Sequence, residues 1–269
     1  MKIASIASGS KGNCIMINNK QSTIIVDMGI SRKKTEEGLE FFGKEPEDID
    51  GILITHEHSD HIKGLGVFLR KYNKPVYATE KTIDYIINES SIGQVDKELF
   101  NVVVPMKEFS IGDVQIMPMP ISHDAKEPVC YKFISDISSE DKTCAVVTDL
   151  GESSDKLINN LQDLDAVFLE ANHDVGMLQA GPYPYYLKQR IWGNRGHLSN
   201  EACGNLINHI ISDKLQHIIL GHLSQENNYP ELAFAAVRNE INFGKHNFCA
   251  DDLDLKVASR IAPSTEVVF

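Results

Sequence analysis

Thr55-His56-Glu57-His58-Ser59-Asp60-His61 follows directly after the apolar segment of residues 51–54. Residues two apart in an extended chain point to the same side, so His56 and His58 can hold one metal ion. Asp60 and His61 lie at the turn into a helix expected from about Ile62, where they can hold a second ion. Imidazole and carboxylate groups suit zinc, manganese or iron. The alternative is a polar loop with chance histidines, but three histidines and an aspartate within six residues argue against it.

Three more residues of ligand type each follow an apolar segment: His123 after residues 117–121, Asp149 after residues 144–148, and His222 after residues 217–221. Each alone is typical of a capped turn. Together they repeat one order, an apolar strand and then a ligand, which predicts that all of them meet at one edge of the structure. Asp27 ends a further strand and is expected to orient the histidine loop from behind.

The composition indicates an ordinary globular protein in one domain, residues 1–269. The chain is 42% hydrophobic and 24% charged, and no apolar run approaches the length of a membrane-spanning helix. The first residues, MKIASIASGSKGN, contain polar residues and glycine too early for the apolar stretch of a secretory signal. Five cysteines lie far apart, are odd in number and form no CxxC pair, which argues against a disulfide framework and against a thiolate zinc site. We therefore expect a reduced, cytoplasmic protein that is not bound to a membrane.

The net charge limits how the chain can contact nucleic acid. It is −12 at pH 7, whereas a protein that coats nucleic acid nonspecifically is normally basic. Any contact with nucleic acid must therefore come from a local site.

Short apolar segments and helical patterns alternate along the chain. We expect strands at residues 3–6, 14–17, 23–26, 51–54, 76–78, 102–104, 114–117, 131–134, 144–147, 166–169, 217–220 and 253–257. Helices are expected at residues 33–42, 62–72, 80–88, 154–161, 200–211 and 231–241. This order predicts an α+β fold in which two mixed sheets pack together with helices outside, a four-layer sandwich.

The ordered set of Asp27, the histidine loop, His123, Asp149 and His222 resembles the five motifs of the metallo-β-lactamase superfamily over most of the chain. The resemblance implies an αββα sandwich with a site for two divalent metal ions, zinc, manganese or iron, at the edge between the sheets. It assigns the first ion to His56, His58 and His123, and the second to Asp60, His61 and His222. Asp149 would bridge the two ions.

Two further motifs narrow the branch of the superfamily. The β-lactamases themselves commonly have a cysteine ligand where this chain has Asp149, and they are exported. Leu169-Glu170-Ala171 and Gly196-His197-Leu198-Ser199 instead resemble motifs of the tRNase Z group. By that resemblance His197 would be a general acid or a phosphate contact, and Glu170 would orient it. The chain lacks a Gly/Pro-rich arm for tRNA, and the 72 residues between Asp149 and His222 are too few for the extra domain of the β-CASP nucleases.

The compact YycJ/WalJ-type group is the most similar, because residues 8–14 and residues 181–188 resemble its sequences. This resemblance implies a 5′→3′ exonuclease that acts on double-stranded DNA through metal-assisted hydrolysis of phosphodiester bonds. Asp60 would orient the attacking water, and His197, held by Glu170, would give a proton to the departing 3′-oxygen. Residues 8–13 form a small-residue loop that either approaches a phosphate or is a plain tight turn.

Aromatic and basic residues are interleaved between Pro182 and His197. Aromatic rings stack on bases and basic groups hold phosphate, so this segment is a candidate nucleic-acid groove beside the metal ions. The expected substrate contacts are Tyr186, Lys188, Arg190, Arg195 and Ser199, the last because it opens a helix whose N–H groups favour an anion. The alternative is an amphipathic helix whose aromatic residues enter the core and whose basic residues face water.

The same residues are compatible with other functions. A small-molecule hydrolase, such as a thioesterase, a lactonase or a cyclic phosphodiesterase, would use the same seven metal ligands. A metal-binding module without catalysis is a further alternative. His209, His217 and His246 are expected to have surface or structural roles. The sequence leaves the native metal and the oligomeric state undecided.

Overall fold

The strands of this protein carry apolar residues on both faces, and this property produces its layers. In β3 (Thr23–Val26), Ile24 and Val26 belong to one buried cluster, whereas Ile25 belongs to another. Because side chains alternate along a strand, each face of such a sheet must be covered by other elements. One face therefore packs against a second sheet and the other against helices.

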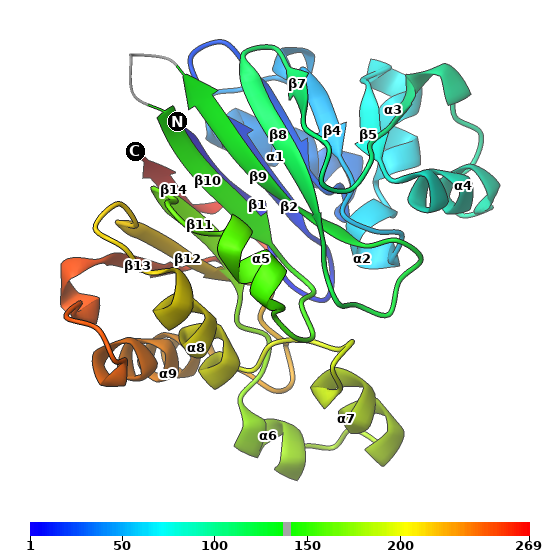
Figure 1. Cartoon of the computed structure of the whole chain (residues 1–269). Coiled ribbons are helices and arrows are strands. Elements are labelled where there is room, and N and C mark those ends of the chain that lie inside the picture. The colour runs from blue at the N-terminus through cyan, green and yellow to red at the C-terminus, as the bar shows by residue number, and fades with distance from the viewer. Residues whose placement is uncertain (137–140) are drawn as a thin grey trace.

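The computed structural model describes residues 1–136 and 141–269, which form two seven-stranded sheets (Figure 1). The first sheet has the order β14-β1-β2-β3-β4-β5-β6 and the second the order β13-β12-β11-β10-β9-β8-β7. The other strands of the first sheet are β1 (Lys2–Ala7), β2 (Cys14–Asn18), β4 (Gly51–Leu53), β5 (Val76–Ala78), β6 (Phe100–Val102) and β14 (Ser264–Val268). Those of the second are β7 (Phe109–Ile111), β8 (Val114–Pro120), β9 (Val129–Asp136), β10 (Asp141–Val147), β11 (Ala166–Glu170), β12 (His217–Gly221) and β13 (Asp254–Val257).

The helices lie outside the two sheets or at their ends. They are α1 (Arg32–Phe41), α2 (Ser59–Ile62), α3 (Leu65–Tyr72), α4 (Glu80–Asn88), α5 (Asp155–Asn160), α6 (Val175–Ala180), α7 (Tyr185–Trp192), α8 (Asn200–Ile210) and α9 (Pro230–Phe243), with 3-10 turns at Pro46–Asp48, Lys97–Leu99 and Ala250–Asp252. Within the described ranges, no helix combines the length and the apolar character needed to cross a bilayer.

Three buried apolar clusters fill the spaces between the layers. One lies between the sheets and includes Leu53 and Phe168. A second joins the first sheet to α1, α3 and α4, and a third joins the second sheet to α5, α8 and α9. The expected α+β fold and four-layer αββα sandwich are confirmed.

Strand direction brings the ends of several strands to one edge. In the first sheet β3 to β6 run parallel, and in the second β10 to β13 run parallel. β8 has the direction of β10, because both pair antiparallel with β9. The segments that follow β3, β4, β8, β10, β11 and β12 therefore carry the candidate site residues.

Some predicted elements differ from the structure. The helix expected at residues 62–72 is divided into α2 and α3, because Gly64 N donates to Met28 O at 3.0 Å and approaches Ile30 closely. A Cβ on Gly64 would lie 1.7 Å from Ile30 O, so the chain needs glycine here. The strand expected at residues 102–104 lies earlier, as β6. β7, β14 and α6 were not predicted, and α7 lies in the segment for which a helix was only the alternative.

Asp165 ties together segments of the second sheet that support the site. Its carboxylate accepts hydrogen bonds from Thr143 N at 2.8 Å and from the ammonium groups of Lys142 and Lys214, both at 3.2 Å. Burial on its own raises the pKa of Asp165, but these three donors outweigh it and hold the pKa below its ordinary value of 3.8. The folded state therefore favours the ionised form.

We predict that Asp165→Ala lowers the free energy of unfolding by about 1–3 kcal/mol at pH 7, because Thr143 N loses its buried acceptor. The folded-state pKa is depressed, so this stabilisation is present above pH 3.8 and is lost as the pH falls further. Urea unfolding from pH 7 to pH 3.5 measures the difference, with Glu40→Ala on the exposed surface of α1 as control. A difference between wild type and Asp165→Ala that grows on acidification would contradict the assignment.

Candidate metal centre

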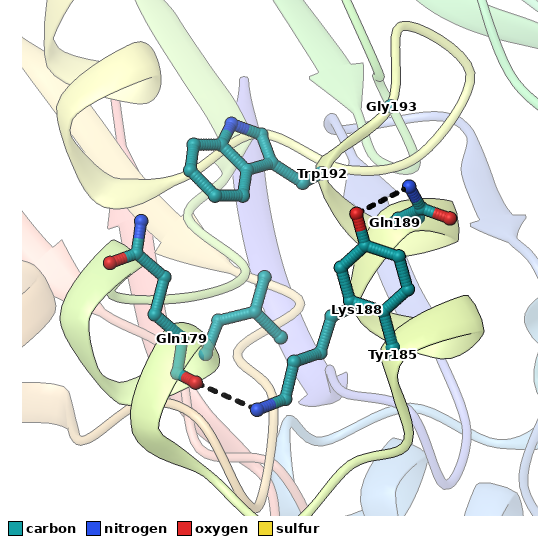
Figure 2. A pocket seen from close by; sticks show the side chains of 7 residues that line it. Gln179, Tyr185, Lys188, Gln189, Trp192 and Gly193 are labelled. Carbon is teal, nitrogen blue, oxygen red and sulfur yellow. Dashed lines mark hydrogen bonds between the residues drawn. The ribbon is translucent and has the colours of Figure 1, made fainter.

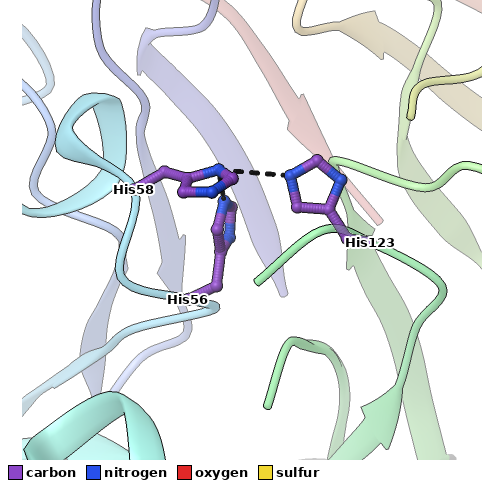
Figure 3. A group of neighbouring side chains, drawn as sticks. All are labelled: His56, His58 and His123. Carbon is purple, nitrogen blue, oxygen red and sulfur yellow. Dashed lines mark hydrogen bonds between the residues drawn. The ribbon is translucent and has the colours of Figure 1, made fainter. Parts of the chain in front are cut away.

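Three histidines from two loops meet at one point (Figure 3). His56 and His58 follow β4, and His123 follows β8. His56 Nε2 lies 3.0 Å from His58 Nδ1, and His123 Nε2 lies 3.2 Å from the same atom. Three imidazole nitrogens so close together can share one cation, and this group is the one expected for the first metal ion.

Polar partners behind the rings fix which nitrogen faces the centre. His61 Nδ1 donates to Asp27 Oδ2 at 2.7 Å, and His123 Nδ1 donates to the Gly196 carbonyl at 3.1 Å. His56 Nδ1 lies 3.0 Å from Thr55 Oγ1, whose hydroxyl donates to the Asp27 carboxylate. With Nδ1 occupied in this way, Nε2 of each ring keeps its lone pair for a cation. Asp27 therefore lies where it was expected, behind the histidine loop.

A second group lies beside the first. Asp60 Oδ2 is 3.5 Å from His61 Nε2 and 3.7 Å from His222 Nε2. These three side chains come from the start of α2 and from the residue after β12, so the second group draws on both sheets. It corresponds to the residues expected for the second metal ion.

Asp149 lies between the two groups. Its Oδ1 is 3.8 Å from His123 Nε2, whereas its Oδ2 is 3.1 Å from His61 Nε2 and 3.0 Å from His222 Nδ1. One carboxylate oxygen thus faces each group, which is the arrangement that a bridging ligand requires. All seven expected ligands are brought together at the edge between the sheets.

Three residues of the centre adopt the left-handed backbone conformation where their strands end. The φ angles are 62° at Asp27, 58° at Asp149 and 53° at His222. This region is unfavourable for most residues with a side chain, although Asp and His enter it more readily than others. Such strain is typical of functional sites.

Charge and burial divide the histidines into two classes. Burial lowers the pKa of His56 well below its usual range and also lowers that of His123, so both rings are held neutral, as metal ligands must be. Burial acts in the same direction on His222, but Asp149 outweighs it and raises the pKa of His222 to about 9. Burial also acts to lower the pKa of His61, but Asp27 and Asp149 outweigh it and raise that pKa well above its usual range. Cations that bind at the second group must therefore displace protons.

The donor set fits divalent cations. Asp149 Oδ2 and His222 Nδ1 are buried and lie 3.0 Å apart, but within the described part of the chain neither atom makes a hydrogen bond of favourable geometry. Buried polar atoms without partners are costly, and a bound cation would offset that cost. Imidazole and carboxylate groups are ligands that zinc, manganese and iron share.

A histidine and a glutamate stand beside this donor set. His197 Nδ1 donates to Glu170 Oε1 at 2.7 Å, and Leu150 N donates to the other carboxylate oxygen, Glu170 Oε2, at 2.7 Å. Glu170 is fully buried at the end of β11, whereas His197 is partly exposed. Burial on its own lowers the pKa of His197, but Glu170 outweighs it and raises the pKa. This pair can hold a proton at the mouth of the site.

The expected substrate contacts lie in different settings. Arg190 pairs with Asp124 and Arg195 donates to the His123 carbonyl at 3.0 Å, so both guanidinium groups hold the loop that carries His123. Lys188 Nζ donates to the Gln179 carbonyl at 2.7 Å, Ser199 Oγ caps α8 through Ala202 N at 3.1 Å, and Tyr186 is 73% exposed.

The alternative in which the aromatic residues of this segment enter the core is wrong. Residues 185–192 do form a helix, α7, but it contains no buried residue. Tyr185 is 74% exposed and Trp192 is 56% exposed. On its inner side, Leu187, Arg190 and Ile191 line a pocket of 170 Å³ together with His197 and Asp124. We call this the inner pocket.

Sequence reasoning missed several residues that support the centre. Asn13 N donates to Asp60 O at 2.8 Å, and Asn13 Nδ2 lies 3.1 Å from His61 Nε2, so the loop of residues 8–13 packs against the histidine loop. A Cβ on Gly29 would lie 1.6 Å from Asp60 O, which requires glycine there. Asp124 Oδ1 lies 3.4 Å from His123 Nε2. Asp124 could have been found from the sequence, because it directly follows the candidate ligand His123.

The chain is similar to known proteins in sequence and in fold. The chain is 40% identical over 240 residues to the exodeoxyribonuclease WalJ of Streptococcus pneumoniae serotype 2 (strain D39), covering 89% of this chain and 88% of that protein. It is 39% identical over 262 residues to the exodeoxyribonuclease YycJ of Bacillus anthracis, covering 95% and 96%. The crystal structure of the metallo-beta-lactamase fold protein YhfI from Bacillus subtilis superposes with a TM-score of 0.69 at 13% identity, covering 99% of each chain.

The family description "Metallo-beta-lactamase superfamily" matches residues 7–222, a range that includes all seven candidate ligands. That match, together with the two relatives at 39–40% identity, agrees with the resemblance of the sequence motifs. The chain therefore belongs to the metallo-beta-lactamase superfamily, whose members bind divalent metal ions.

Proposed function

We propose that this chain is a metal-dependent exodeoxyribonuclease that degrades double-stranded DNA in the 5′→3′ direction. The observation that carries the proposal is the His197–Glu170 pair, 2.7 Å apart, beside a donor set for two cations. The leaving group of a phosphodiester is an alkoxide, which is a poor leaving group, so its hydrolysis benefits from a proton donor. The thiolate that leaves a thioester does not need one. Two relatives that span most of the chain are named exodeoxyribonucleases, which supports DNA as the substrate.

The seven candidate ligands would hold two divalent ions, zinc, manganese or iron: His56, His58 and His123 for the first, Asp60, His61 and His222 for the second, and Asp149 between them. When bound, such ions supply Lewis acidity, which lowers the pKa of water and offsets the charge that develops on a phosphoryl group. Asp27 keeps the His61 ring in the orientation described above.

The side chains of the chain itself supply orientation and proton transfer. Asp60 is 21% exposed, so one of its oxygens can accept a proton from an attacking water and orient that water toward phosphorus. His197 would donate its Nε2 proton to the departing 3′-oxygen, while Glu170 holds Nδ1. Arg190, Arg195 and Lys188 give the neighbouring surface a positive character, and Tyr186 and Ser199 lie on the same segment.

We also propose that residues 1–269 work as one domain. In support, β1 pairs with β14, so the first and last strands lie in one sheet, and the Met1 amino group donates to Phe269 O at 2.7 Å.

The proposed activity predicts stepwise release of nucleotides from the 5′ end of a duplex. The metal-loaded protein would be incubated with duplexes labelled internally that carry a 5′-phosphate or a 5′-hydroxyl, with the corresponding single strands, and with a thioester. We expect the duplex to be shortened from its 5′ end, and a chelator should stop the reaction because the ligand set then lacks its ions. Hydrolysis of the thioester with no degradation of DNA would overturn the proposal.

Two histidines on one strand provide a matched test of the metal site. His222 follows the carboxyl end of β12, whereas His217 begins the same strand and pairs with Asp254 at 3.0 Å. We predict that His222→Ala lowers the bound metal from two ions to one per chain and abolishes DNA cleavage, because the second group loses a ligand. His217→Ala should keep both ions. Metal analysis after dialysis measures the content, and two retained ions in His222→Ala would contradict the ligand assignment.

A substrate that needs no proton donor tests the role of His197. We predict that His197→Ala lowers kcat for DNA by about 10²–10⁴-fold, the usual contribution of general acid catalysis. Hydrolysis of bis-p-nitrophenyl phosphate should fall much less, because nitrophenolate leaves without a proton. Metal content should stay at the wild-type value, which serves as the control. An equal loss on both substrates would assign His197 to another role.

A further inference from the structure

Helix α7 separates two pockets. On one side Leu187, Arg190 and Ile191 line the inner pocket, next to His197. On the other side a pocket of 540 Å³ is lined by Tyr185, Lys188, Gln189 and Trp192 of α7, by Gly193, and by Leu178 and Gln179 of α6. Figure 2 shows Trp192 facing Gln179 across this hollow, with Lys188 and Tyr185 along its side. We call this second hollow the aromatic pocket.

The helical repeat explains why the two pockets lie on opposite faces. Residues 185, 188, 189 and 192 are spaced by three and four positions, so they form one face of the helix. Residues 187, 190 and 191 form the other face. A single helix thus separates the candidate catalytic site from an apolar hollow of a size typical for ligand sites.

The aromatic pocket offers flat apolar surfaces to a ligand. Leu178 is 1% exposed and forms an apolar part of its lining, whereas Trp192 and Tyr185 are more than half exposed. α6 and α7 project from the end of the sandwich where the candidate site lies (Figure 1). Exposed rings of this kind are suited to stacking against a nucleobase.

The charge of residues 175–200 favours a polyanion as the ligand of the aromatic pocket. Residues 175–200 contain Lys188, Arg190 and Arg195 but none of the 38 acidic residues of the chain. The remaining chain is strongly acidic, so a nucleic acid meets less repulsion at this segment than elsewhere.

Two contacts hold the helix in place relative to the candidate site. Arg190 pairs with Asp124, the residue after His123. Lys188 Nζ donates to Gln179 O at 2.7 Å and thereby ties α7 to α6. These contacts fix α7 relative to α6 and to the loop that carries His123, so the helix can keep its position when a duplex binds.

We propose that α7 is a wedge that parts the end of a DNA duplex. The strand to be cut enters the inner pocket beside His197, and the first unpaired base of the complementary strand enters the aromatic pocket, where it stacks on Trp192. Separation of a terminal base pair costs free energy, and stacking on the ring offsets that cost. This inference rests on the proposed exonuclease function and adds to it the binding site for the strand that is not cut.

The kinetic test compares duplex and single-stranded DNA with the same labelled strand. We expect Trp192→Ala to lower the ratio of kcat/KM for duplex to kcat/KM for single strand about tenfold, the usual effect of losing one base–aromatic stack. Trp192→Phe keeps a ring and should restore most of the ratio. Phe243→Ala removes a ring that is 84% exposed at the end of α9 and should leave the ratio unchanged.

A second measurement needs no cleavage. Trp192 is the only tryptophan in the sequence, so tryptophan fluorescence excited selectively at about 295 nm reports on this position alone. The metal-loaded protein would be titrated with a duplex whose terminal linkages are phosphorothioates, and stacking should quench the fluorescence. A duplex closed by hairpins at both ends offers no free end and should quench it much less.

The possible outcomes separate this inference from the proposed function. If the wild-type protein degrades no DNA, both are wrong. If it degrades DNA but Trp192→Ala leaves the ratio of duplex to single strand unchanged, or if open and closed duplexes quench equally, only the wedge is wrong. If Trp192→Ala changes the oligomeric state in size-exclusion chromatography and not the ratio, the face binds a second copy of the chain and the wedge is also overturned.

Discussion

The buried carboxylate of Asp149 is the contact on which the candidate centre depends. A charge removed from water is costly unless it has close partners, and Asp149 finds them in His61 and His222 at 3.1 and 3.0 Å. His61 lies in α2, which follows β4 of the first sheet, whereas His222 follows β12 in the second. One carboxylate therefore connects the two sheets at the edge where the site lies. The pKa of Asp149 is accordingly held well below its usual range, since these histidines outweigh the opposing effect of burial.

The distribution of charge reconciles an acidic protein with a polyanionic substrate. The net charge of −12 repels DNA over most of the surface, whereas the segment without acidic residues lies against the candidate centre. Cations in the centre would add positive charge at the same place. Because such attraction is local, it positions a DNA end at the site and does not favour coating of the duplex along its length.

Local sequence signals located most of the fold and the candidate ligands, because both depend on short periodic patterns. β3, β5 and α4 have the bounds that periodicity predicts, and each candidate ligand follows an apolar segment. For α7 the sequence offered a helix only as an alternative, and with its aromatic residues in the core, whereas the helix buries no residue. The contacts of Asn13 and Gly29 with Asp60 join positions distant in the sequence. The partner of a guanidinium is likewise set by three-dimensional neighbours, as Arg195 and the His123 carbonyl illustrate.

The left-handed residues at the strand ends have a consequence for the integrity of the molecule. Each of these backbone conformations is unfavourable by itself, and the surrounding contacts must compensate for it. Cations that engage Asp149 and His222 would contribute to that compensation, so part of the binding free energy becomes free energy of folding. Loss of the ions would then loosen the rim of the sandwich before its interior. Where metal is scarce, proteases would then reach the rim that carries the candidate site before they reach the interior.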